Sequence, residues 1–406
     1  KIEKKNYNGI KIGLFNTPCA GFGDIIVCKT FYDYLSQWYP GASVTICTTT
    51  PAKYNDLGIK GTIYKLYNKF NNDDSECIEY DELILKKKIK FDIMIAIPII
   101  NKTFDIKSFQ KLIPYANVFN TFSVSEYNGE YPPYTFPIGV GKGNLGLLFN
   151  DFKIKQQKLI KKPYALVYIQ PSPEWGVHSK TCFVSYLEMI CKKYGKKYGK
   201  KHTTFDVIMP DWIIEEINGN SSFFNRVKSI IIKYYGNWNI LYSDGENVSL
   251  FESDSKSCLT FRGDILPQPR EIFISLMKDS VEDILVTGDQ SLTDVFSCCR
   301  MHKKVWYQIA PWKQGLAYNL SKHLPNDNFS TFKTSCGTLK SIKGNIDWKR
   351  FLSDYDFRIK GKKRMDSILV GRCILNCDTK LQKEILNIIE RSRFLESAQK
   401  KINKLK

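Results

Sequence analysis

Short apolar runs alternate with amphipathic segments along most of the chain, and this alternation constrains the fold more than any other feature. In the first 150 residues the pattern predicts strands over 10–16, 43–48, 62–67, 91–97 and 117–124, and helices over 24–38, 78–88 and 104–113. The predicted strands are apolar on both faces. We therefore expect a parallel sheet that is covered by helices.

The same alternation restarts after residue 156, with strands predicted over 164–170, 205–209, 238–243, 258–261, 283–287 and 303–308, and helices over 181–194, 270–278 and 291–299. A passage rich in Pro and Gly, GEYPPYTFPIGVGKGNLG, and the basic segment KIKQQKLIKK separate the two halves, and we interpret them as a loop region and a linker. The sequence thus predicts an α/β protein with two Rossmann-like domains, residues 1–155 and 156–325. Residues 326–406 form a C-terminal extension that ends in a long basic amphipathic helix over 379–406.

The composition is that of a folded protein without a membrane span. The 406 residues are 43% hydrophobic, which is enough for two domains with separate cores. Neither a signal peptide nor an apolar stretch of about 20 residues is found, so we expect a cytoplasmic protein. The 12 cysteines have no zinc-ligand spacing, which predicts mostly reduced thiols and no metal site.

The net charge of +19 predicts an anionic partner. Nucleotide phosphates, an acidic acceptor, a membrane face and nucleic acid all fit. Lysine runs over 86–90 and 192–201 are equally explained as solvated faces. No signature of a zinc finger, a helix-turn-helix or an RNA-recognition motif is present, so nucleic-acid binding is the alternative function rather than the preferred one.

The first candidate loop, NTPCAGFGDII, joins the first strand to the first helix. Gly21 and Gly23 allow a ligand to approach the backbone, and the helix directs its positive end toward the same edge of the sheet. Asp24 has two interpretations, either a helix N-cap or a general base that takes a proton from an acceptor hydroxyl. The remaining spacing of a dinucleotide fingerprint is absent, so a NAD site is not expected.

The second candidate loop, in DILVTGDQSLTDVFSC, has the same position in the second half. Here Gly288, Asp289, Gln290 and Ser291 follow a buried strand, and a helix is expected from about Ser291. The first backbone N–H groups of that helix suit a diphosphate, and the Asp289 and Gln290 side chains suit sugar hydroxyls. The alternative is a turn in which Ser291 caps the helix and Asp294 completes a capping box.

Further candidates follow other strands of the second half. QPSPEWGVHSKT supplies Ser172, Ser179 and Lys180 for a diphosphate, with Lys180 as the cation, or else it is a solvated loop in which Ser179 caps a helix. FRGDILPQPREIF supplies Arg262 for the nucleotide, or for a structural ion pair. APWKQG follows the last strand at the same edge and offers Lys313.

The strand, the GFGD turn, the apolar helix and the segment YPGASVTICT together resemble the N-terminal signature of GT-B glycosyltransferases, especially the lipopolysaccharide heptosyltransferase group. The resemblance implies two Rossmann-like domains that face each other across a cleft, with a C-terminal extension that packs back on the N-terminal domain. It also implies Asp24 as the catalytic base of a metal-independent, inverting transfer from a nucleotide sugar. The first domain would take the acceptor, and the second the donor.

The chain departs from that family in the donor loop, where GDQS stands in place of the family's motif with Asp and His. The donor sugar is therefore left open. The expected acceptor is a glycan, a lipid-linked or a protein hydroxyl, including acidic ones, with peripheral membrane association as a further expectation. We expect no cofactor, since the nucleotide sugar is a substrate. A basic nucleic-acid-binding protein and an inactive nucleotide-sugar-binding homologue are the alternatives.

Overall fold

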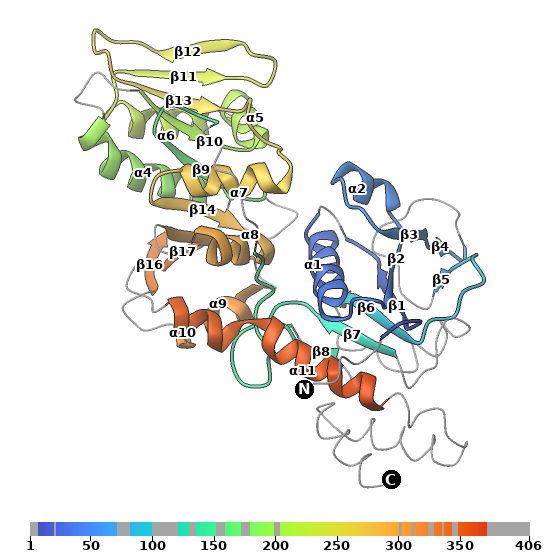
Figure 1. Cartoon of the computed structure of the whole chain (residues 1–406). Helices are drawn as coiled ribbons and strands as arrows, with labels where there is room; N and C mark the ends of the chain where they lie inside the picture. The colour runs from blue at the N-terminus through green and yellow to red at the C-terminus, as the bar shows by residue number, and fades with distance from the viewer. Residues whose placement is uncertain are drawn as a thin grey trace. The chain divides into compact units, whose positions relative to one another are not determined.

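The chain forms two compact units: the first comprises Lys1–Phe149 and Arg350–Lys406, and the second Asn150–Lys349. Figure 1 labels their elements. The structure is a computed structural model, and it describes residues 7–19, 22–70, 82–99, 121–129, 135–151, 159–171, 179–198, 204–299, 303–310, 313–323, 329–334, 337–342 and 348–371.

The sheet of the first unit is parallel throughout, in the order β3-β2-β1-β6-β7-β8. Its strands are β1 (Lys11–Asn16), β2 (Ser43–Thr48), β3 (Thr62–Lys65), β6 (Ile93–Ile99), β7 (Thr121–Ser125) and β8 (Thr135–Phe136). A separate ribbon is formed by β4 (Tyr67–Asn68) and β5 (Leu83–Ile84), and the helices are α1 (Gly23–Trp38), α2 (Pro51–Asp56), α10 (Trp348–Tyr355), which begins at the unit boundary, and α11 (Phe357–Gly371).

The core of the first unit explains its apolar runs. Five of the six residues of β1 are buried, and a Cβ on Gly13 would lie 2.8 Å from the ring of Phe91, so only glycine lets that ring pack on the strand. Helix α1 lies against β1, β2 and β6 through one apolar face. Phe357, at the start of α11, packs against Phe31 and Tyr34 of that helix, which joins the returning chain to this unit.

The second unit is built on a sheet in the order β12-β11-β13-β10-β9-β14-β15-β17-β16. The adjacent strands β11, β13, β10, β9, β14 and β15 are all parallel. At the two margins of the sheet, β12 pairs antiparallel with β11, and β17 and β16 continue antiparallel from β15. Its strands are β9 (Tyr164–Tyr168), β10 (Thr204–Ile208), β11 (Asn237–Leu241), β12 (Asn247–Phe251), β13 (Cys258–Arg262), β14 (Asp283–Thr287), β15 (Lys304–Gln308), β16 (Phe329–Thr334) and β17 (Gly337–Ile342).

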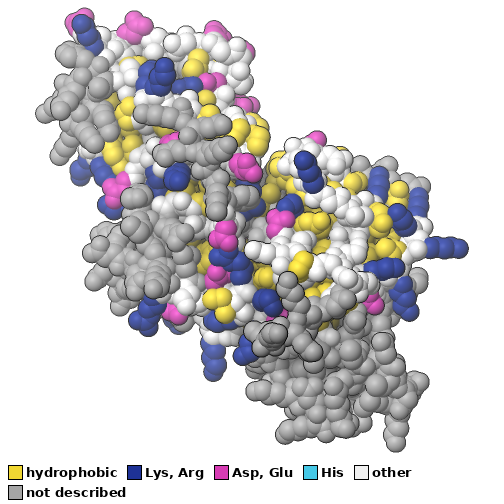
Figure 2. Space-filling view, viewed as in Figure 1, with side chains coloured by type: hydrophobic (Ala, Val, Ile, Leu, Met, Phe, Trp, Pro, Cys, Tyr) yellow, Lys and Arg dark blue, Asp and Glu magenta, His cyan; other side chains and the backbone are white. Residues whose placement is uncertain are grey.

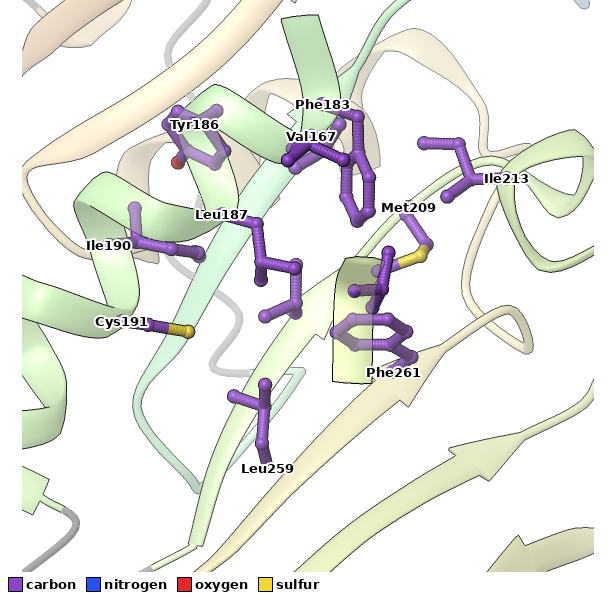
Figure 3. Packing of buried hydrophobic residues seen from close by; sticks show 14 of the residues in the cluster. Val167, Phe183, Tyr186, Leu187, Ile190, Cys191, Met209, Ile213, Leu259 and Phe261 are labelled. Carbon is purple, nitrogen blue, oxygen red and sulfur yellow. The ribbon is translucent and has the colours of Figure 1, made fainter. Parts of the chain in front are cut away.

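One face of this sheet is covered by α4, α5 and α6. The unit's helices are α4 (Ser179–Tyr198), α5 (Asp211–Gly219), α6 (Ser221–Ile231), α7 (Arg270–Asp279), α8 (Asp289–Asp294), the π-helical turn η3 (Val295–Cys299) and α9 (Gln314–His323). Figure 3 shows Phe183 and Leu187 of α4 among strand residues such as Val167 and Phe261, all of them buried. This apolar layer is what the alternating sequence pattern of the second half encodes.

Four sequence predictions differ from the structure or fall outside it. The predicted helix over 78–88 is wrong where it is described, because Leu83–Ile84 is a short strand paired with β4. Residues beyond 326 were expected to leave the second half, but β16 and β17 extend its sheet through β15. The predicted helices over 104–113 and 379–406 lie outside the described residues.

The basic run over 86–90 lies at the surface beside β3, β4 and β5, where Figure 2 shows several Lys and Arg side chains. Lys86 and Lys87 lie over the rings of Tyr67 and Tyr64, with the ammonium 3.9 and 4.0 Å from the ring centroids. In the sequence, five carboxylates over 71–81 precede the four lysines of this run, so this stretch of the chain carries no net positive charge. The run by itself therefore does not favour a polyanion site.

The amino ends of β14 and β15 are joined through one buried carboxylate, Asp283. It accepts hydrogen bonds from the Tyr194 hydroxyl at 2.7 Å and the Trp306 indole N–H at 2.9 Å, and it pairs with Lys193. Three donors from two elements thus depend on a single side chain, as expected for an ion buried inside a protein.

Replacing this carboxylate is expected to destabilise the second unit. Asp283→Ala leaves two buried donors without their acceptor and removes the buried partner of Lys193, which costs about 3 kcal/mol of the free energy of unfolding in urea. Glu282→Ala is the control, because Glu282 is an exposed partner of Lys193 and Lys304 and its loss costs less than about 1 kcal/mol. Equal effects of the two variants would contradict this role for Asp283.

Lys303, just before β15, predicts a pH dependence of stability. Burial lowers its pKa from 10.5 to about 8, although its ammonium donates to the Ser280 and Val281 carbonyls. Between these pH values the unfolded state binds more protons, so the free energy of unfolding rises with pH by about 3 kcal/mol from this group. Urea titrations of the wild type and of Lys303→Met from pH 7 to 10.5 measure the free energy of unfolding against pH and isolate the contribution of Lys303. If the two pH curves stay parallel, Lys303 makes no such contribution.

Candidate functional site

Asp24 does not cap α1. The N-cap is Phe22, which makes no side-chain capping bond, and Asp24 is the second residue of the helix. Its carboxylate is half-buried and accepts a hydrogen bond from the Cys19 backbone N–H at 2.9 Å, across the preceding loop. The cap interpretation of Asp24 is therefore wrong, and the carboxylate is oriented at the carboxyl edge of the sheet by its own loop.

The same loop contains a glycine, an exposed aromatic ring and a disulfide. A Cβ added to Gly23 would meet no described atom within 4 Å, so the space beside it is open, whereas Gly21 lies outside the described residues. Phe22 is 47% exposed, with the Lys53 ammonium 5.8 Å from its ring centroid. Cys19 is disulfide-bonded, an exception to the expected reduced thiols, while the other described cysteines are free.

Asn16, the last residue of β1, holds this edge together. Its side chain is fully buried, donates to the Ile97 carbonyl of β6 at 2.8 Å and accepts from the Tyr54 hydroxyl of α2 at 2.8 Å. Its amide also lies 3.5 Å from the carbonyl oxygen of Asp24. Two strand ends and the first turns of two helices are thus fixed by one amide.

Two hydroxyls at the end of β2 complete the edge, and the sequence analysis missed them. The side-chain oxygens of Thr49 and Thr50 are buried and have no hydrogen-bond partner among the described residues. Buried hydroxyls are normally bonded, so this pair is an exception that a ligand or an ordered water would satisfy. The run TTT after an apolar strand was the only signal in the sequence.

The second loop places its helix two residues earlier than predicted. Gly288 is the N-cap, with φ of 81°, and α8 begins at Asp289. Since the Leu292 N–H already bonds the Gly288 carbonyl, the N–H groups without an acceptor inside the helix are those of residues 289–291. The capping alternative is wrong, because Ser291 lies inside the helix and no side chain caps it.

The side chains of this loop are held by distant partners. Asp289 pairs with Lys313, which follows β15, and lies 3.4 Å from the Tyr307 hydroxyl. Gln290 donates to Asp294 at 3.0 Å, while its own carbonyl oxygen is buried without a partner among the described residues. The edge after β14 therefore combines a helix start, a lysine and an amide.

Asp294 is bound by several donors, and none of these contacts is a cap. Arg270, at the start of α7, donates from Nε at 3.1 Å and from Nη2 at 2.7 Å, and Asn150 donates at 2.5 Å. This buried carboxylate fixes α7 and the chain around Asn150 to α8. Arg270 and Asp294 are 24 residues apart in the chain, and the sequence did not indicate that they pair.

Gln308, the last residue of β15, organises the edge of the second unit. Its carbonyl oxygen accepts from the Gln170 N–H at 3.0 Å, and its amide donates to the Ser179 hydroxyl at 2.9 Å. Ser179 is buried and donates to the Gln170 carbonyl at 2.5 Å. Ser179 thus joins α4 to the strand ends, and the neighbouring candidate Ser172 lies outside the described residues.

The two other cationic candidates are engaged elsewhere in the unit. Lys180 pairs with Glu216 of α5 at 2.9 Å. Arg262 forms a two-bond pair with Asp264 at 2.7 Å and a further bond to Asp206 at 2.9 Å, so the ion-pair alternative describes its contacts. Burial raises the pKa of the Asp206 carboxyl in spite of this bond. Lys313 is the cation that contacts the GDQS loop.

Loss of Asn16 is expected to loosen the edge of the first unit. Asn16→Ala leaves the Ile97 carbonyl and the Tyr54 hydroxyl unsatisfied and costs about 2–4 kcal/mol of the free energy of unfolding. Tyr54→Phe removes only one of the two bonds and costs about 1 kcal/mol. Urea unfolding followed by circular dichroism measures both, and a cost of Asn16→Ala no larger than that of Tyr54→Phe would be evidence against its joining function.

Among the described residues, no group of His, Cys, Asp or Glu side chains is arranged to hold a metal ion, and no helix is long and apolar enough to cross a membrane. No protein-family model matches the chain, and no curated protein is similar to it. A solved structure of a glycosyltransferase from Rickettsia africae ESF-5 is similar over 98% of each chain at 12% identity, with a TM-score of 0.36. At that score the likeness carries no argument about fold or activity.

Proposed function

We propose that the chain is a glycosyltransferase that moves a sugar from a nucleotide-sugar donor to an acceptor hydroxyl. The observation that carries this proposal is the Asp24 carboxylate, which lies at the carboxyl edge of a parallel sheet and is oriented by the Cys19 N–H rather than used as a cap. Ligands of open parallel sheets bind at that edge. The GFGD resemblance gives this carboxylate the part of general base.

In the proposed reaction, Asp24 takes the proton of the acceptor hydroxyl. The acceptor oxygen forms a bond to the anomeric carbon of the donor sugar while the bond from that carbon to the diphosphate breaks. The diphosphate leaves with the electron pair. The first N–H groups of α8 stabilise it, and Lys313 offsets the negative charge that Asp289 would otherwise place beside the diphosphate. No step in this scheme requires a metal, and inversion at the anomeric carbon follows from the resemblance.

The parts of the site divide between the two units in this proposal. The first unit takes the acceptor near Asp24, with Phe22 and the hydroxyls of Thr49 and Thr50 at the same edge. The second unit takes the nucleotide sugar at residues 288–291. Ser179 joins α4 to the ends of β9 and β15 on either side of that loop, whereas Arg262 joins β13 to β10. Neither is proposed to contact the donor, because each is engaged within the unit.

A panel of nucleotide sugars tested for hydrolysis and transfer checks the proposal. Asp24→Asn is expected to lower kcat about 10²–10⁴-fold while donor binding, followed by thermal shift, stays unchanged. Asp33→Asn is the matched control, since Asp33 lies on the same helix, is exposed and pairs only locally with Lys29. Full activity of Asp24→Asn would remove it as the base, and binding of nucleotide sugars without any turnover would indicate an inactive homologue.

A further inference from the structure

The chain crosses from the first unit to the second between Phe149 and Asn150, and both residues are anchored. The Phe149 carbonyl accepts from the Tyr34 hydroxyl of α1, the helix that begins with Asp24. Asn150 is bonded to α8 and η3, which follow the GDQS loop. Each side of one peptide bond is thus tied to the helix of one candidate loop.

Asn150 uses its backbone and both ends of its side chain for this anchorage. Its N–H donates to the Ser297 hydroxyl at 3.2 Å, and its amide donates to Asp294 at 2.5 Å. Its carbonyl oxygen accepts from the Cys298 thiol at 3.0 Å.

Hydrogen bonds continue from these contacts to the GDQS loop along the first turns of α8. The Ser297 hydroxyl donates to the Thr293 carbonyl at 2.6 Å, and the Thr293 hydroxyl lies 3.1 Å from the Asp289 carbonyl and 3.0 Å from that of Gln290. Because Ser297 lies in a π-helical turn, this part of the helix departs from regular geometry, as is frequent near functional sites.

A second connection runs through a single oxygen atom. Asp294 Oδ1 accepts from Asn150 at 2.5 Å, from Gln290 at 3.0 Å and from Arg270 at 2.7 Å. A carboxylate has about four lone-pair sites on its two oxygens, so three donors on one oxygen share about two of them. A change in the Gln290 contact is therefore expected to alter the contact of Asn150.

We propose that Asn150 is a positioning residue that couples the GDQS loop to the crossing between the units. Ser297 and Asp294 connect the loop to the crossing. A ligand that fixes the conformation of residues 288–291 therefore also restricts the motion of the chain at residue 150. The identity of that ligand rests on the proposed function. The coupling itself rests on the contacts of the ligand-free chain.

Amide hydrogen exchange of the ligand-free protein tests the coupling directly. Lys313→Gln removes the partner of Asp289 and loosens the loop, and we expect the Asn150 N–H to exchange at least about fivefold faster. Lys193→Gln is the matched control, because it breaks the Lys–Asp pair at the opposite end of β14 and should leave Asn150 unchanged. Faster exchange in the loop without a change at Asn150, or equal effects of both variants, overturns the proposal.

Kinetics separate positioning from a merely structural role. Asn150→Ala is expected to lower kcat about tenfold while the donor KM stays within about twofold. Asn237→Ala is the control, because it removes an asparagine that also makes two side-chain hydrogen bonds but lies on a remote strand, and it should change neither constant. A rise in KM that accompanies the fall in kcat overturns the positioning role. If no nucleotide diphosphate or nucleotide sugar binds, the proposed function fails, and the exchange experiment alone decides the coupling.

Discussion

In each unit, one buried side-chain amide holds the carboxyl edge formed by the parallel strands. Asn16 joins the ends of β1 and β6 to α2, and Gln308 joins the end of β15 to Gln170 and to Ser179 of α4. Parallel strands end at a common edge, where their last backbone groups turn away from the ladder and still require partners. An amide supplies a donor and an acceptor at once. The GFGD loop, which follows β1, and the chain that follows β15 therefore begin from fixed points.

The two ends of β14 show how similar side chains take different parts in one fold. Asp283 at its start and Asp289 just beyond its end each pair with a lysine. Asp283 is surrounded by buried donors from α4 and β15, which makes it a structural ion at the amino edge. Asp289 stands in the first turn of a helix at the carboxyl edge, where ligands of such sheets bind. Location, rather than residue type, makes Asp283 a structural residue and Asp289 a candidate for ligand binding.

In the proposed coupling, Asn150 connects the GDQS loop to the crossing between the units through Asp294. Three donors meet on one oxygen of Asp294, and one of them belongs to the loop and another to the crossing. One oxygen cannot satisfy all three donors equally, so a change in the hydrogen-bond geometry of one donor alters the hydrogen bonds of the other two. The π-helical turn places Ser297 within reach of the Asn150 N–H and adds the second connection.

By itself, the sequence determined the α/β class, most of the strands and the helix after GFGD, because apolar periodicity reports which faces are buried. It also located Asp24 and the GDQS loop at strand ends. Only the tertiary structure decided that neither Asp24 nor Ser291 caps a helix, that Lys313 pairs with Asp289 and that Arg262 pairs with Asp206. These contacts join residues far apart in the chain, and local pattern carries no information about partners that folding brings from other strands.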